Sequence, residues 1–190
     1  MPDPRPEVME FLLSRRSRPA KTLGDAAPVR EVMMRLLTAA ARVPDHGKLE
    51  PWRFVVIEGD ARSRTVEAAR ARGLAIGFDA DRADKAANAF RMGGVIVAVV
   101  ASPNPQASIP VWEQELSAGA VCLGLVNASL AEGWGANWLT GPFAREDGFL
   151  AEALGCQPGE FVAGFVHIGS ETVRPADRPR PNVEALTHWL

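Results

Sequence analysis

Six consecutive residues, Val95-Ile-Val-Ala-Val-Val100, constrain the fold more than any other stretch of the chain. Five of the six are β-branched, which favours a strand, and none is polar. A strand without a polar side needs apolar cover on both faces of its sheet. The run therefore predicts a layered fold in which a sheet is flanked by helices.

The rest of the chain supplies both strands and helices. Trp52–Ile57 and Phe161–Ile168 are expected to be strands because they are short, apolar and bounded by turn residues. Trp134–Trp138 is either a short strand or an extended loop. Apolar patterns predict helices over Val8–Leu13, from Pro28 to before Pro44, and over Trp112–Glu132 and Phe149–Leu154. A helix capped by Asp60 is expected through Arg72, with Gly73 just beyond it. Asp79–Asn88 is charged and alanine-rich, which indicates a solvated helix. The many small residues in the helix that starts at Trp112 indicate that neighbouring elements pack closely against it.

This order of elements favours an α+β sandwich with one mixed, mostly antiparallel central sheet flanked by helices. The 190 residues suffice for one full-sized core. The sequence shows no internal repeat or long linker, so we expect a single domain over residues 1–190.

Composition narrows the function. The chain is 47% hydrophobic with a net charge of −2, which argues against disorder and against nucleic-acid binding. The Pro-rich start has no apolar signal-peptide core and no run is long enough to span a membrane, so a cytoplasmic protein is expected. Two cysteines and three histidines lack metal-site spacing, so no metal site is expected.

Two stretches carry most of the reactive side chains. The first, Arg42-Val-Pro-Asp-His-Gly-Lys-Leu-Glu-Pro-Trp52 (loop 42–52), is either a simple turn or a binding loop on a rigid scaffold. The second, Arg15-Arg16-Ser17, follows the first helix. Its arginines either complement the helix dipole or bind an anion.

Several enzyme templates fail. Gly133-Trp-Gly135 lacks the third glycine of a dinucleotide fingerprint, and neither an ATPase phosphate loop nor Gly-x-Ser-x-Gly is present. Asp45-His46 has no evident partner for hydrolysis. Phosphate-binding arginines without a catalytic acid–base pair suit a cofactor that brings its own chemistry. Flavin, nicotinamide, coenzyme A and a phosphorylated metabolite all remain open on these grounds.

Four segments together resemble the nitroreductase family, and most closely its small, single-domain, FMN-dependent NAD(P)H nitroreductase subgroup. They lie in the family's order over residues 8 to 170 and are Arg15-Arg16-Ser17, Arg42-x-Pro-Asp-His-x-x-x-x-Pro-Trp52, Pro110-x-Trp-Glu-Gln-Glu-x-Ser-Ala-Gly119 and Gly133-x-Gly-x-x-Trp138. The resemblance implies a homodimer with FMN at the subunit interface. It implies hydride transfer in two half-reactions, from NADH or NADPH to flavin N5 and then to a nitroaromatic, a quinone or a similar acceptor, without a catalytic side chain.

The resemblance also implies which residues contact the cofactors. Arg15, Arg16 and Ser17 would hold the FMN phosphate and ribityl chain, and Arg42 and His46 would reach the flavin from the other subunit. The same pocket would be lined by Trp138, Leu139 and Thr140. A nicotinamide-binding segment would comprise Ala128, Ser129, Leu130, Ala131, Glu132 and Gly133.

Two positions depart from the family pattern. Glu50 stands where many relatives have Gln, and it would either oppose a reduced anionic flavin or pair with Lys48. Leu139 stands where the subgroup carries an arginine, a loss that Arg178 or Arg180 in the tail would replace unless these arginines are simply solvated. The alternatives to a nitroreductase are a non-catalytic flavin-binding store or sensor and a related flavin chemistry such as dehalogenation.

Overall fold

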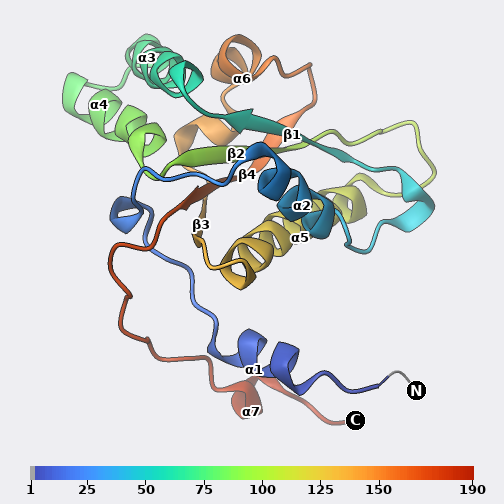
Figure 1. The fold of residues 1–190 in the computed structure, drawn as a ribbon. Helices are drawn as coiled ribbons and strands as arrows, with labels where there is room; N and C mark the ends of the chain where they lie inside the picture. The colour runs from blue at the N-terminus through green and yellow to red at the C-terminus, as the bar shows by residue number, and fades with distance from the viewer. Residues whose placement is uncertain (1–2) are drawn as a thin grey trace.

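The computed structural model describes residues 3–190, in which a four-stranded sheet is packed between helices (Figure 1). The strands run in the order β1-β2-β4-β3, and each neighbouring pair is antiparallel. Their bounds are Trp52–Ile57 (β1), Val95–Ala101 (β2), Gly135–Leu139 (β3) and Phe161–Gly169 (β4). The helices are Pro6–Ser14 (α1), Arg30–Ala40 (α2), Asp60–Ala75 (α3), Ala80–Asn88 (α4), Val111–Ala131 (α5), Asp147–Leu154 (α6) and Val183–Leu186 (α7).

The predicted α+β class with a mostly antiparallel sheet is confirmed, and so is the double cover of the β-branched run. Every residue of β2 is buried. Its side chains alternate between two separate apolar clusters, with Ile96 in one and Val97 in the other. Full burial of one aliphatic side chain stabilises a fold by about 1.5–3 kcal/mol. The central strand is therefore a main source of stability for both layers.

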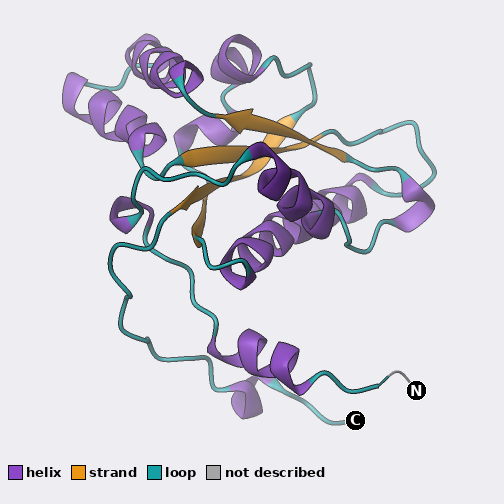
Figure 2. Cartoon of the chain, viewed as in Figure 1, coloured by secondary structure: helices purple, strands orange, loops and turns teal. Residues whose placement is uncertain are grey.

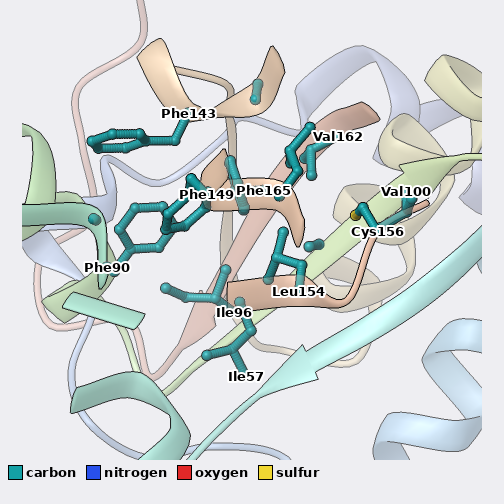
Figure 3. Close-up of a cluster of buried hydrophobic side chains, with 14 of the residues drawn as sticks. Ile57, Phe90, Ile96, Val100, Phe143, Phe149, Leu154, Cys156, Val162 and Phe165 are labelled. Atoms are coloured by element: carbon teal, nitrogen blue, oxygen red, sulfur yellow. The ribbon is translucent and has the colours of Figure 1, made fainter. Parts of the chain in front are cut away.

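Different helices cover the two faces of the sheet. The α3, α4 and α6 helices lie on one face, where a group of phenylalanines fills the cluster shown in Figure 3. Phe90 packs edge-on against Phe165 with ring centroids 5.1 Å apart. On the other face, α2 and α5 supply Leu36 and Leu125 to the second cluster. The predicted close approach of α5 to a neighbour is present, because a Cβ on Gly124 would lie 3.0 Å from the Ala40 carbonyl oxygen.

The cap and the C-terminal end predicted for the helix that starts near Asp60 are both wrong. Asp60 is the first residue of α3 and makes no capping bond, and the helix continues past Gly73 to Ala75. Gly73 is buried inside the helix, where an added Cβ would lie 3.3 Å from the Ala83 Cβ of α4. The glycine therefore permits two helices to pack closely, a tertiary role that a local helix-stop pattern does not distinguish.

The two ends of the chain lie outside the layers. No residue of α1 is buried, and α1 and the tail that follows β4 extend beneath the packed body (Figures 1 and 2). Their large apolar side chains, including Leu13 and Trp189, are strongly exposed. Within residues 3–190, no helix has the length and apolarity needed to cross a membrane.

Candidate functional site

The Arg15–Pro19 segment is held against β3, the strand at one edge of the sheet. The Arg18 amide donates a 2.8 Å hydrogen bond to the Ala136 carbonyl oxygen. The Asn137 side-chain nitrogen donates in return to the Arg18 carbonyl oxygen at 2.8 Å. Arg18 also forms an ion pair with Glu171 in the tail. These contacts fix the backbone from which the two preceding arginines project.

A cavity of about 370 Å³, which we call the arginine hollow, opens where this segment, β3 and the tail meet. Its lining contains four arginines and, among the described residues that form it, no carboxylate. The lining residues are Arg15, Arg16, Ser17, Pro19, Asn137, Trp138, Arg178 and Arg180. The structure thus brings the three residues predicted to hold a phosphate together with Arg178 and Arg180 of the tail.

Arg15 is the most constrained cation in the arginine hollow. Its Nη2 donates to the Ser17 hydroxyl at 3.1 Å, but its buried Nε has no hydrogen-bond partner among residues 3–190. Burial lowers the pKa of the Arg15 guanidinium, and the nearby charges of Arg180 and Arg18 lower that pKa further. Desolvation and like-charge repulsion both disfavour the cation, so an anion in the hollow would relieve an existing electrostatic cost.

Trp138 forms a flat apolar wall beside these charges. Its Nε1 donates to the Ala163 carbonyl oxygen at 3.1 Å, and the indole lies across Gly164, where a Cβ would meet Nε1 at 2.1 Å. Leu139 and Thr140, which were predicted to line the same pocket, are not among the residues that line the arginine hollow. Of this predicted group, the structure brings only Trp138 to the arginines.

The predicted nicotinamide segment lies beside the arginine hollow. Leu130 and Gly133 line an adjoining cavity of about 500 Å³ that also borders Arg15 and Arg16. The other four residues of the segment do not line it: Ala128, Ser129, Ala131 and Glu132. The Ser129 hydroxyl donates instead to the Leu125 carbonyl oxygen at 2.8 Å, and Glu132 pairs with Arg35 of α2.

Loop 42–52 is a tightly hydrogen-bonded turn. The Asp45 carboxylate accepts from the amides of Leu49 at 3.2 Å and Glu50 at 2.9 Å. Lys48 and Glu50 have φ values of 52° and 48°, an uncommon region for residues other than glycine. Strained backbone of this kind persists only where the surroundings impose it. Glu50 is exposed, and no ion pair joins it to Lys48 within the described part of the chain.

His46 lies at an apolar cavity of about 390 Å³ formed by the loop and the first turns of α5. Its Nδ1 is 2.7 Å from Glu113 Oε2. This cavity and the arginine hollow share no lining residue. Glu113 borders the His46 cavity, and Leu130 borders the cavity that adjoins the arginine hollow; the two residues are separated by 17 helical positions or about 25 Å along α5. Within one chain, His46 therefore lies apart from Arg15, and Arg42 is not among the residues that line the two cavities.

Several polar residues that line these cavities were not predicted as site residues, among them Asn137, Glu113 and Arg174. Asn137 is the polar residue of β3, and Glu113 begins the polar run Glu113-Gln114-Glu115 in the first turn of α5. Local sequence does not show that either side chain lies at a cavity. Tail residue Arg174 borders the larger cavity. For Arg174, the available sequence signal was the cluster of arginines near the end of the chain. That cluster does not show that the tail returns to the first helix.

Comparison with known proteins identifies the family. Residues 12–170 match the Nitroreductase family model. The chain is 35% identical over 168 residues to the Escherichia coli (strain K12) protein named "Putative NAD(P)H nitroreductase YdjA", covering 88% of this chain and 90% of that one. A Haemophilus influenzae protein named "Putative NAD(P)H nitroreductase" is 33% identical over 165 residues, covering 86% of this chain and 88% of its own.

Solved structures agree on the fold. A nitroreductase-like family protein from Bacillus cereus superimposes with a TM-score of 0.81 at 21% identity, covering 96% of this chain and 95% of that one. A Desulfovibrio desulfuricans nitroreductase homologue, solved in complex with FMN, gives a TM-score of 0.73 at 23% identity and covers 96% of both chains. The predicted resemblance is confirmed, and this chain belongs to the nitroreductase family.

Proposed function

We propose that this protein is an FMN-dependent NAD(P)H oxidoreductase that passes electrons to a nitroaromatic, a quinone or a similar acceptor. The observation that carries the proposal is the arginine hollow, with four arginines and the unsatisfied Nε of Arg15. A phosphate monoester carries between one and two negative charges near neutral pH and offers several acceptor oxygens. Guanidinium forks match that geometry.

The residues of the hollow fit FMN at both of its ends. Arg15, Arg16 and Ser17 would hold the phosphate, with Arg178 or Arg180 supplying the cation that Leu139 does not. Trp138 would offer its indole plane to the flexible chain or the ring. The FMN complex of the Desulfovibrio desulfuricans homologue, which shares the fold, supports this choice over other phosphorylated cofactors.

When bound, FMN supplies the redox chemistry by accepting a hydride from NADH or NADPH and then reducing the acceptor in a second half-reaction. The chain's residues need only bind and orient the reactants and exclude water. The names of the relatives support NAD(P)H as the donor. The cavity beside the arginine hollow, bordered by Leu130 and Gly133, is the proposed place for the nicotinamide nucleotide.

A homodimer would complete the site. Trp112, Leu116 and Leu123 form an exposed stripe on α5, with 60%, 64% and 46% of their surface accessible. Their spacing of four and seven residues places them on one helix face. The α1 helix and the tail are also uncovered. A second copy packed on these surfaces would bring its Arg42 and His46 toward the arginine hollow of the first.

A spectroscopic experiment tests the proposal. The purified protein should show the visible absorbance of oxidised FMN, lose it when NADH or NADPH is added without oxygen, and regain it when a quinone or nitroaromatic follows. A colourless protein that does not take up added FMN would contradict the flavin assignment. A yellow protein that neither nucleotide bleaches would indicate a flavin store or sensor instead.

Substitution in the arginine hollow locates the phosphate. Each charge-assisted hydrogen bond is worth about 1.5–3 kcal/mol, so Arg15→Ala should weaken FMN binding about tenfold to a hundredfold. Arg64→Ala on the exposed side of α3 is the matched control and should leave FMN affinity unchanged. Equal affinity in both variants would show that the phosphate binds elsewhere.

A further inference from the structure

The start of α5 holds loop 42–52 through two side chains. The Ser117 hydroxyl donates a 2.8 Å hydrogen bond to the Pro44 carbonyl oxygen. One helical turn earlier, the Glu113 carboxylate meets the His46 ring at 2.7 Å. Because both groups project from one helix, the same rigid element sets the position of the loop backbone and of the imidazole.

The first turn of α5 is itself fixed by a buried amide. Gln114 Nε2 donates to the carbonyl oxygens of Ile109 at 2.9 Å and Asn104 at 3.0 Å, and its Oε1 accepts from the Asn104 amide at 2.8 Å. Gln114 is 3% exposed, so these bonds are shielded from water. These bonds hold the backbone of the first turn of α5, from which the neighbouring Glu113 side chain projects.

The hydrogen bond between Glu113 and His46 sets the orientation of the imidazole ring. An ionised carboxylate only accepts hydrogen bonds, so the nitrogen facing Glu113 must carry a proton. This fixes Nδ1–H toward α5 and leaves Nε2 as the hydrogen-bonding atom on the other side of the ring. The His46 side chain remains 65% exposed, which leaves Nε2 accessible. Asp45, the adjacent carboxylate, is occupied by the loop's own amides.

We propose that Glu113 is a positioning residue that holds His46 in the Nδ1–H tautomer and so presents Nε2 as a hydrogen-bond acceptor to an N–H group of the flavin ring bound by the second copy of the proposed homodimer. The inference rests on the proposed function, because it takes FMN at the dimer interface as the ligand that meets Nε2. It gives Glu113 a role that acts through another side chain, beyond a stabilising surface ion pair, which is commonly worth less than about 1 kcal/mol.

Nitrogen-15 NMR of the histidines in the full chain tests the ring orientation without cofactor. The chain has three histidines, so His46→Gln assigns the signal of interest. His167 is an internal reference, since its buried Nδ1 lies 3.1 Å from the Met92 carbonyl oxygen and must donate to it. At about pH 8.5, where imidazole is neutral, His46 should show a protonated Nδ1 in the native protein.

Glu113→Ala should remove this preference and leave the His167 signal unchanged. Glu115→Ala is the matched control, because it deletes the same group two positions along α5, on a different side of the helix. The control should keep the His46 tautomer. A native His46 protonated at Nε2, or a tautomer that Glu113→Ala does not alter, would overturn the positioning role.

FMN titration then tests the link to the cofactor. Glu113→Ala and His46→Ala should each weaken FMN binding about three- to tenfold, the range expected for one hydrogen bond. The double variant should bind no more weakly than His46→Ala, since Glu113 acts through His46. Additive losses, or unchanged affinity in Glu113→Ala, would overturn the inference.

The two experiments separate the inference from the proposed function. If the native protein binds no FMN, the proposed function fails together with the flavin contact of Nε2, while the NMR result still decides whether Glu113 orients the ring. If FMN binds and only the tautomer test fails, the proposed function stands and Glu113 has no positioning role.

Discussion

Glu160 joins the ends of two strands and a turn through one carboxylate. Arg53 of β1 donates to it from Nε at 2.9 Å and from Nη2 at 2.7 Å, and the Gln157 amide donates at 2.8 Å. The Ser102 hydroxyl, just past β2, donates as well. These donors, led by Arg53, lower the pKa of Glu160 to about 2. The carboxylate is therefore more acidic in the folded than in the unfolded chain.

This difference predicts how stability depends on pH. Because the unfolded state binds the proton more tightly, stability rises with pH between about 2 and the unfolded pKa of about 4.3. Glu160→Gln should lower the free energy of unfolding by about 1–3 kcal/mol above pH 5, and the difference should shrink as pH falls toward 2. Urea denaturation across this range measures it. Glu67→Gln, exposed on α3, should show no such trend.

Single residues show how far the sequence leads. Two arginines beside a helix end left either the helix dipole or an anion as their partner, and the resemblance implied the FMN phosphate. The structure places Arg15 and Arg16 together in the arginine hollow, and their binding of a phosphate stays a prediction. Glu113 was missed because its partner, His46, is 67 positions away in the chain. Contacts between distant segments depend on tertiary packing, which local spacing does not encode.

The α6 helix depends on a cap that also docks it. Glu146 accepts from the amides of Gly148 at 3.3 Å and Phe149 at 2.6 Å, which satisfies two unpaired donors at the helix start. The same carboxylate pairs with Arg72 of α3, whose Nη2 lies 2.6 Å from Oε1. Arg72 and the two amides lower the pKa of Glu146, so it stays ionised at neutral pH.

Removal of this carboxylate should destabilise the phenylalanine-rich layer. Glu146→Ala leaves two helix-start amides without their acceptor, and a loss of about 1–3 kcal/mol in the free energy of unfolding is expected. Thermal or urea denaturation measures the loss. Glu152→Ala, exposed on the same helix, is the control. An equal effect of both substitutions would show that the loss does not come from the cap.

Among the elements, those with strong local patterns were predicted best. Both ends of β1 were predicted correctly, and the ends of β2 and α5 were predicted to within one residue, because turn or helix-breaking residues flank each element. The α3 helix was predicted too short because Gly73 resembles a helix stop. The strand order β1-β2-β4-β3 was not predicted, since pairing is decided by which apolar faces can be buried together.

At the scale of the whole molecule, the exposed stripe on α5 (Trp112, Leu116 and Leu123) is the surface that a second copy is proposed to cover. Leu116→Glu would place a charge in that interface and should convert a dimer to a monomer, with FMN affinity falling at the same time. Sedimentation and FMN titration measure the two effects. Leu74→Glu changes an exposed leucine on α3, far from the stripe in sequence, and should alter neither. A dimeric Leu116→Glu protein would place the interface elsewhere.

The position of Arg15 and Arg180 on one cavity has a mechanical consequence. The Arg180 guanidinium already reaches the Arg15 carbonyl oxygen at 3.4 Å. A phosphate held between their side chains would act as a non-covalent cross-link between segments separated by 165 positions. Without the cofactor the tail is held there by fewer contacts, among them the hydrogen bond from Arg180 to Arg15 and the Arg18–Glu171 ion pair, so proteases should nick the tail faster in the cofactor-free protein than when FMN is in excess.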